Sequence, residues 1–224
     1  MKNILSYVLV FGLVFSLVSC KNKGEKADVA GKGDVAKAEG ATTFVVDAAN
    51  SVFKWEGYKP TGTHNGTINI KGGEFKVENG ELVAGNLNLD MTSIVSLDLE
   101  GDNKTDLEAH LRGTTEGKEN DFFNTTKYPT ATFEITKVTK LINSDDASHM
   151  VYGNLTIKEV TKEVGFKTSI DIMDSKLMAK APKFNIDRTD WDIKFMSKTF
   201  DEKFKDKFIN DEIGLEAELV ANAK

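Results

Sequence analysis

Residues 75–91 read FKVENGELVAGNLNLDM, and apolar and polar side chains alternate along this stretch on both sides of Asn79-Gly80. Strict alternation is typical of a β-strand that buries one face. An Asn-Gly pair between two such runs is a strong signal for a tight hairpin turn. Leu87 and Leu89 fall on one face of the return strand, so this stretch predicts an antiparallel hairpin with one buried side.

The same alternation recurs along the chain, without the strand–helix–strand rhythm of a parallel sheet. Many antiparallel strands joined by short turns indicate an all-β domain, either a closed barrel or a sandwich. Closure removes the unpaired strand edges that invite aggregation. A barrel of about eight strands can be filled by its own side chains or can hold one small ligand. Further alternating segments occur at 53–56, 68–71, 131–135, 155–157, 164–172 and 213–221.

Two stretches depart from the alternation. Residues 105–112 predict a short helix, with Leu107 and Leu111 on one face and Gly113 just beyond its end. Residues 195–209 predict either an amphipathic helix or an ordered loop. In that second stretch an aromatic residue recurs at every fourth position, at Phe200, Phe204 and Phe208.

The N-terminus resembles the export signal of a bacterial lipoprotein. Lys2 precedes a mostly apolar run from Ile4 to Val18, which is shorter than the roughly 20 residues of a transmembrane helix. Residues 1–19 are therefore predicted to be a signal peptide, cut before Cys20, the only cysteine. Acyl chains on Cys20 would anchor the mature chain to a membrane. The alternative is an ordinary secretory signal in which Cys20 is incidental.

Composition divides the rest of the chain into a tether and a domain. Residues 20–42 contain almost no large apolar side chains, so they predict a disordered tether from a lipidated Cys20. Residues 43–224 have the size of one domain with one core. The net charge of -6 and the pI near 5.2 argue against nucleic acid as a partner.

We expect a location in the cell envelope, on the periplasmic face. We favour the outer membrane over the inner one, because Lys21 offers no acidic retention signal.

Three motifs carry a resemblance to a known family. DFFN at 121–124 is followed by YPTATF at 128–133, and GNLTIKEVTKEV (153–164) and FNIDRTDW (184–191) come later in the chain. Together and in this order they resemble the YceI-like family of lipid- and polyisoprenoid-binding proteins. Glu159 replaces the glycine usual at the turn in the second motif. The resemblance implies a lipocalin-like, extended antiparallel barrel of about eight strands with one or two short helices. It also implies an apolar tunnel for isoprenoid chains such as those of quinones or polyprenyl phosphates.

The candidate ligand-binding residues are mostly aromatic and lie near strand ends, or face inward by the alternation. They could line an apolar pocket, or they could simply pack the core and plug the barrel ends. The candidates are Phe53, Trp55, His64, Phe122, Phe123, Tyr128, Phe133, Leu155, Phe166, Phe184, Arg188 and Trp191.

Polar candidates are few. His64, His110 and His149 lack a short ligand spacing, so no metal site is expected. His110 is expected to cap or pack the short helix, and His64 to lie at the barrel mouth near a polar head group. For Arg188 two interpretations remain. It pairs within the chain with a nearby carboxylate, or it contacts a phosphate or quinone oxygen. The carboxylates considered are Asp187, Asp190 and Asp192.

The sequence lacks a nucleophile elbow, a zinc-protease motif and a glycine-rich phosphate loop, so an enzyme is not expected and no cofactor is implied. The leading hypothesis is a membrane-tethered carrier that holds a long apolar, isoprenoid-type lipid inside the barrel. The alternative is an envelope structural or stress-response protein with a packed barrel and no ligand. A homodimer is left open.

Overall fold

A computed structural model describes residues 24–204 and 207–224 of the chain. The expected signal peptide (1–19) and Cys20 lie outside these residues. Within the described part, no helix is long and apolar enough to cross a bilayer.

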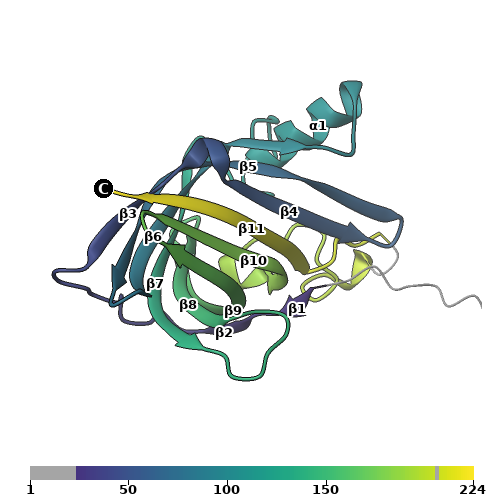
Figure 1. Cartoon of the computed structure of the whole chain (residues 1–224). Coiled ribbons are helices and arrows are strands. Elements are labelled where there is room, and N and C mark those ends of the chain that lie inside the picture. Colours follow the sequence, from purple (N-terminus) through teal and green to yellow (C-terminus); the bar gives the residue numbers. More distant parts are fainter. Residues whose placement is uncertain (1–23, 205–206) are drawn as a thin grey trace, which may run out of the picture.

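The core of the fold is a closed barrel of antiparallel strands (Figure 1). Each strand pairs with the next along the chain, and the last pairs with the first, from Ile213 opposite Gly57 to Glu218 opposite Val52. The barrel prediction is confirmed, and the sandwich alternative is wrong. The strands are β4 (Val52–Lys59), β5 (Gly62–Glu78), β6 (Glu81–Ser96), β7 (Thr130–Lys140), β8 (His149–Ile157), β9 (Val160–Met173), β10 (Lys176–Asp187) and β11 (Glu212–Ala223).

A short strand, β3 (Thr42–Val46), lengthens the barrel at one end. It lies between β11 and β5, in line with β4, and pairs with both neighbours. A 3-10 turn, η1 (Ala48–Asn50), separates the two halves of this split strand. At the same end of the barrel lies the predicted β5–β6 hairpin. Asn79 and Gly80 have φ angles of 51° and 79°, the left-handed values that a tight hairpin turn requires.

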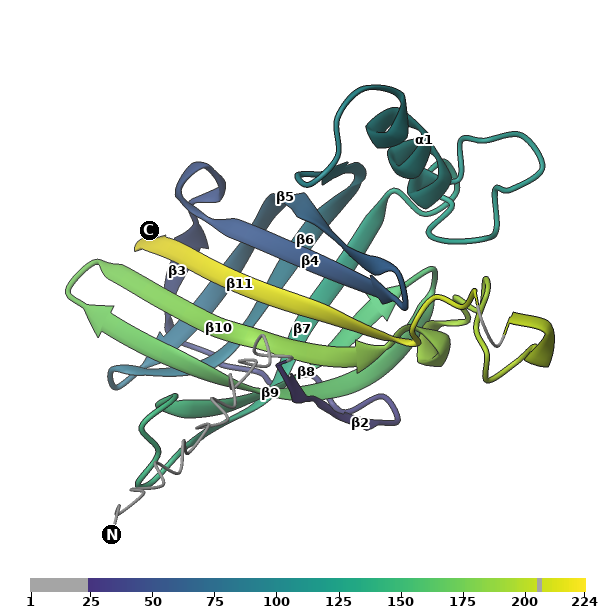
Figure 2. The same ribbon diagram turned by 90° about the vertical axis from the view of Figure 1, so that its right-hand side faces the viewer.

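The opposite end is covered by α1 (Gly101–Arg112) and by the loop between β10 and β11 (Figure 2). The helix prediction is confirmed, although α1 begins four residues before the expected start, at Gly101 rather than Thr105. Gly113 ends it with a φ of 71°, and its N–H bonds to the carbonyls of the last turn. Leu111 is buried, and Leu107 packs against the core.

The described residues of the segment 195–209, which exclude 205–206, form a loop and not the helix of the two alternatives. Among its described residues the only helical turn is η3 (Glu202–Phe204), and η2 (Arg188–Trp191) precedes the segment. The periodic rings do not form one buried face, because each lies beside a lysine ammonium instead. Lys194 lies 4.8 Å from the Phe200 ring centre, Lys203 lies 4.8 Å from that of Phe204, and Lys198 lies 4.4 Å from that of Phe208.

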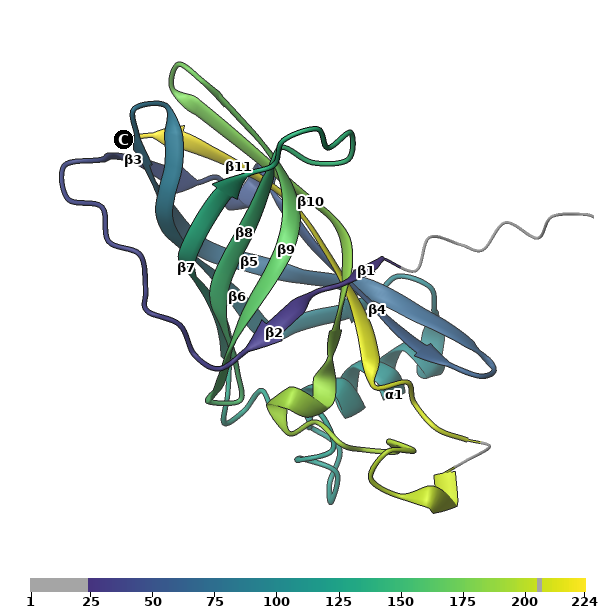
Figure 3. The same ribbon diagram turned by 90° about the horizontal axis from the view of Figure 1, so that it is seen from below.

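The prediction of a disordered tether is wrong for residues 25–30. Strands β1 (Glu25–Lys26) and β2 (Asp28–Ala30) lie along the barrel wall (Figure 3). The cause is a gap in the wall, because β9 and β10 pair only up to Ser169 opposite Lys180. Beyond that point β1 pairs with β10 and β2 pairs with β9. Backbone hydrogen bonds hold this segment, so its polar composition gave no sign of it.

Asn154 fastens the segment a few residues further on. Its fully buried side chain accepts a hydrogen bond from Gly33 N–H and donates one to Gly33 O, both 2.8 Å long. We expect Asn154→Ala to lower the free energy of unfolding by about 1–3 kcal/mol, since it leaves the partly buried N–H and carbonyl of Gly33 without their partner. Hydrogen exchange should accelerate at Gly33 and Ala36, and much less in β5 and β6. Unchanged protection at Gly33 would show that Asn154 does not hold the segment.

Candidate functional site

The largest apolar space in the barrel lies under α1 and the β10–β11 loop. This cavity, the outer chamber, has a volume of about 370 Å³ and a wall that is almost entirely hydrocarbon. Strands contribute inward-facing side chains, as the alternation predicts, and η2 and its loop contribute the cover. Representative wall residues are Leu89, Ala131, Ile157, Ile186, Ile193 and Ile213.

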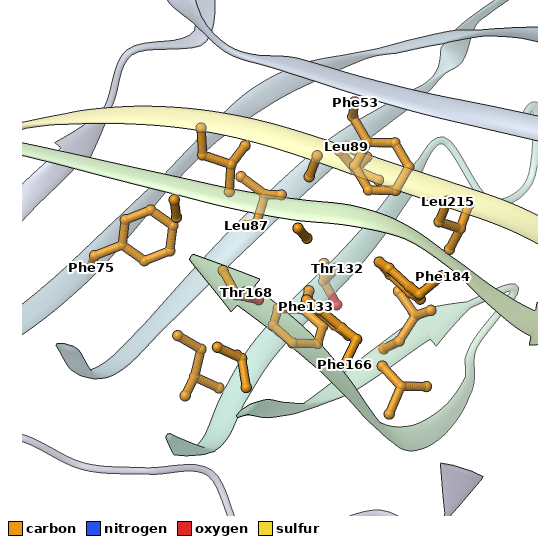
Figure 4. A pocket seen from close by; sticks show the side chains of 18 of the residues that line it. Phe53, Phe75, Leu87, Leu89, Thr132, Phe133, Phe166, Thr168, Phe184 and Leu215 are labelled. Atoms are coloured by element: carbon orange, nitrogen blue, oxygen red, sulfur yellow. The ribbon is translucent and has the colours of Figure 1, made fainter. Parts of the chain in front are cut away.

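A second space, the inner chamber, continues toward the other end of the barrel but holds only about 80 Å³. Both chambers are bordered by Phe53, Leu89, Leu155 and Leu215, so the two spaces adjoin. Phenylalanine rings line the inner chamber together with aliphatic side chains (Figure 4). Phe166 and Phe184 stack with ring centres 4.2 Å apart and planes 3° from parallel, and Phe133 lies 5.5 Å from Phe166.

Two histidines border the outer chamber, each bonded to a carboxylate. His64 Nδ1 lies 2.8 Å from Asp98 Oδ2, and His110 Nε2 lies 2.8 Å from Asp121 Oδ2. Burial alone would raise the pKa of Asp98, but hydrogen bonds from Asn65 N–H and the His64 side chain outweigh it, with a smaller contribution from Ser96, and hold that pKa below its usual value. The imidazoles are thus held in fixed orientations beside an apolar space.

His110, itself a residue of α1, lies edge-on to Phe122 and Phe195, with both ring centres 4.9 Å away. Its ring thus packs α1 against two loop residues that the sequence did not indicate. His149 lies apart from both of these histidines, on β8. The described residues include no group of three or more His, Cys, Asp or Glu that could hold a metal ion.

Arg188 is a structural anchor of the loop that covers the outer chamber. Its guanidinium donates to three backbone carbonyls, at Ile193 (2.7 Å), Ile209 (3.1 Å) and Asn210 (3.1 Å), and to Asp211 Oδ1 (3.2 Å). Burial lowers the pKa of Arg188, and Asp211 and Asp187 oppose that shift. The intramolecular interpretation is therefore the correct one.

The predicted partners of Arg188 are wrong, since the carboxylate that pairs with it comes from the far end of the loop. Asp187 instead accepts hydrogen bonds from the Thr189 N–H and hydroxyl. With four hydrogen bonds to the protein from five N–H donors, the guanidinium has little capacity left for a ligand.

The structure brings most of the predicted ligand-binding residues together. Phe53, Trp55, His64, Phe122, Phe123, Leu155 and Arg188 border the outer chamber, and Phe53, Phe133, Leu155, Phe166 and Phe184 border the inner one.

Tyr128 and Trp191 border neither chamber. Trp191 is a core residue with no exposed surface, and its indole N–H donates to Leu155 O at 3.0 Å. Tyr128 lies in a turn near the start of β7, under the Lys127 ammonium at 4.9 Å. All of these aromatic candidates lie near a loop in the sequence. That position alone could not separate Tyr128 and Trp191 from the aromatic residues that border a chamber.

Several wall residues are absent from the predicted set. Ile213 continues the alternation that marks Leu215, so the pattern could have identified it. Phe195 and Met196 could not be found in this way, because they lie in an irregular loop without periodicity. His110 was expected only to cap or pack the short helix.

Tyr58, at the rim, carries a buried hydroxyl with no hydrogen-bond partner among the described residues. Burial, followed by the charges of Glu56 and Glu212, raises the pKa of Tyr58 to about 12. Because the folded state keeps the proton longer than the unfolded chain, whose pKa is about 10, this contribution to stability is complete below about pH 10 and is lost as the pH rises toward 12.

We therefore expect Tyr58→Phe to be as stable as the wild type at neutral pH, or more stable by about 1 kcal/mol, since it removes an unpaired polar group. At about pH 11 the stability of Tyr58→Phe relative to the wild type should increase. At that pH the Tyr58 phenol of the unfolded wild type loses its proton, which stabilises the unfolded state, and Phe has no such proton. Urea unfolding at both pH values measures it, with Tyr152→Phe as the control. A variant less stable than the wild type at both pH values would contradict the assignment.

The closed antiparallel barrel and its apolar outer chamber place the chain among the β-barrel proteins that enclose a ligand-sized cavity. Within that class, the chain belongs to the YceI-like domain family, whose model matches residues 44–221. The comparison with curated proteins found no match.

Two solved structures share the fold. BcnA from Burkholderia cenocepacia superposes with a TM-score of 0.61 at 17% identity, covering 79% of this chain and 99% of that one. A polyisoprenoid binding domain from Saccharophagus degradans, implicated in plant cell wall breakdown, gives a TM-score of 0.58 at 13% identity, covering 82% and 99% of the two chains.

Proposed function

We propose that this protein binds a long apolar lipid of the isoprenoid type in the outer chamber and acts as a membrane-tethered carrier. The observation that carries the proposal is the outer chamber itself, with about 370 Å³ of space and a hydrocarbon wall. This volume lies within the range of about 300–1,000 Å³ typical of small-molecule sites. Family membership and the polyisoprenoid-binding relative support an isoprenoid as the guest.

Burial of the guest would supply the driving force. Each methylene removed from water contributes about 0.8 kcal/mol. A lipid that leaves a bilayer was already in an apolar environment, so the net gain on entering the barrel is much smaller. This balance suits a protein that takes up and releases lipid, rather than one that traps it.

The imidazoles of His64 and His110 suit contact with the polar head of the guest. Both border the outer chamber at the end covered by α1, and each is oriented by a carboxylate. Arg188 has no such role in this proposal, because its donors already bond to the protein.

Acylation of Cys20 would place the carrier at its lipid source. We propose anchoring in the cell envelope, on the periplasmic face and more specifically at the outer membrane. This part rests on the sequence alone, since residues 1–23 lie outside the described structure. The proposal assigns the protein no catalytic step, and it does not depend on a homodimer.

The alternative, a structural protein with a packed barrel, requires a bore filled by its own side chains. The inner chamber approaches that condition, but the outer chamber does not.

Lipid extraction of the purified protein tests the proposal. The full chain, expressed with its own N-terminus in a bacterial host, would be isolated in mild detergent, extracted with organic solvent and examined by mass spectrometry. We expect an isoprenoid lipid enriched over its share in a matched membrane extract. Ordinary phospholipid in membrane proportions, with no uptake of added isoprenoid, would overturn the proposal.

A further inference from the structure

The vacant space in the barrel is distributed unevenly along its axis. About 370 Å³ lies in the outer chamber and about 80 Å³ in the inner one, although both lie within the same set of strands. An apolar chain that enters beneath α1 therefore has room at first and then meets a narrow section.

Three phenylalanine rings pack against one another in the wall of the narrow section. Phe133, Phe166 and Phe184, here called the ring row, come from β7, β9 and β10. They border the inner chamber (Figure 4), and none of them borders the outer one. Phe166 stacks on Phe184 at 4.2 Å, and Phe133 lies 5.5 Å from Phe166, so a chain that reaches past the outer chamber meets packed rings.

From these observations we infer that the ring row, which borders the inner chamber, stops an apolar tail that reaches past the outer chamber, so that the protein selects isoprenoid lipids by chain length. Short isoprenoids lie entirely within the outer chamber. Longer ones either leave part of the tail outside or force the rings apart. This inference rests on the proposed function and narrows it. Among isoprenoid lipids the shorter chains are preferred, and a longer chain binds with part of its tail outside the outer chamber.

Competition between two isoprenoid alcohols tests the inference. Farnesol and the much longer solanesol are offered together in detergent micelles to the full chain, which is then reisolated by gel filtration and extracted for mass spectrometry. We expect the wild type to favour farnesol by roughly tenfold, the factor that corresponds to the loss of the ring contacts. The double variant Phe166→Leu, Phe184→Leu keeps the site apolar but removes the stack. It should reduce the preference about fivefold.

Phe75→Leu is the matched control, because Phe75 borders the inner chamber outside the ring row. It should leave the preference unchanged. Circular dichroism verifies folding, and the single variant Phe166→Leu serves if the double variant does not fold.

Equal uptake of both alcohols by the wild type would overturn the length selection while supporting the proposed function. An unchanged preference in the folded ring-row variants would overturn the role of the rings. Retention of neither alcohol by any version would overturn both proposals.

Discussion

Arg188→Met is expected to lower the free energy of unfolding by about 3–5 kcal/mol, the largest loss of stability that we predict. The change removes one charge and leaves Asp211 and three backbone carbonyls without the donor that now satisfies them. Because those carbonyls belong to the loop that covers the outer chamber, the loop should also become accessible to protease. Urea unfolding and limited proteolysis measure the two effects.

Arg112, the other arginine, supplies the matched control. Its side chain is partly exposed and pairs at 3.4 Å with the buried Glu108, whose carboxylate also accepts a hydrogen bond from Ser96 N–H. Because Glu108 keeps that donor, Arg112→Met should cost only about 1–2 kcal/mol. Arg188→Lys keeps the charge but loses the planar fork, and should fall between Arg188→Met and the wild type. An Arg188→Met variant as stable as Arg112→Met would contradict the anchoring role.

The second large effect concerns uptake. Ala131→Phe should reduce retention of farnesol at least about tenfold, because the new ring occupies the outer chamber in place of the guest. The same change should alter stability by less than about 1 kcal/mol, since vacant space accommodates the ring and its burial offsets any strain. Retention after gel filtration and urea unfolding are the two measurements.

Ala181→Phe makes the same substitution in the wall of the inner chamber. There the bore is nearly full, and overpacking should cost about 1–3 kcal/mol. If both alanine variants lost similar stability, the outer chamber would be no more vacant than the inner one. If Ala131→Phe retained farnesol like the wild type, the guest would have to lie elsewhere.

Much of the fold could be predicted, because strand alternation and turn chemistry are local. Asn79-Gly80 adopts the expected hairpin, and Gly113 ends the helix whose face Leu107 and Leu111 define. Alternation also placed Phe133, Leu155 and Phe166 toward the interior, where they border the chambers. These predictions held because the buried face of a strand or helix is encoded in the spacing of its residues.

Other features depend on the closed barrel and have no local signal. Strands β1 and β2 are held by backbone hydrogen bonds at a gap between β9 and β10, and composition does not encode such a gap. Arg188 pairs with Asp211, which is 23 residues away, although three carboxylates lie within four residues of it. The small volume of the inner chamber depends on how rings such as Phe166 and Phe184 pack inside the barrel. Strand alternation predicts which side chains face inward, but not how much space they leave.

A crystal structure of the protein grown with farnesol tests the central claim most directly. The account predicts continuous density for the tail in the outer chamber, against Leu89, Ile157 and Ile213, with the hydroxyl near His64 or His110 and the ring row undisturbed. An outer chamber closed by its own side chains, or farnesol bound only on the outside of the barrel, would contradict it.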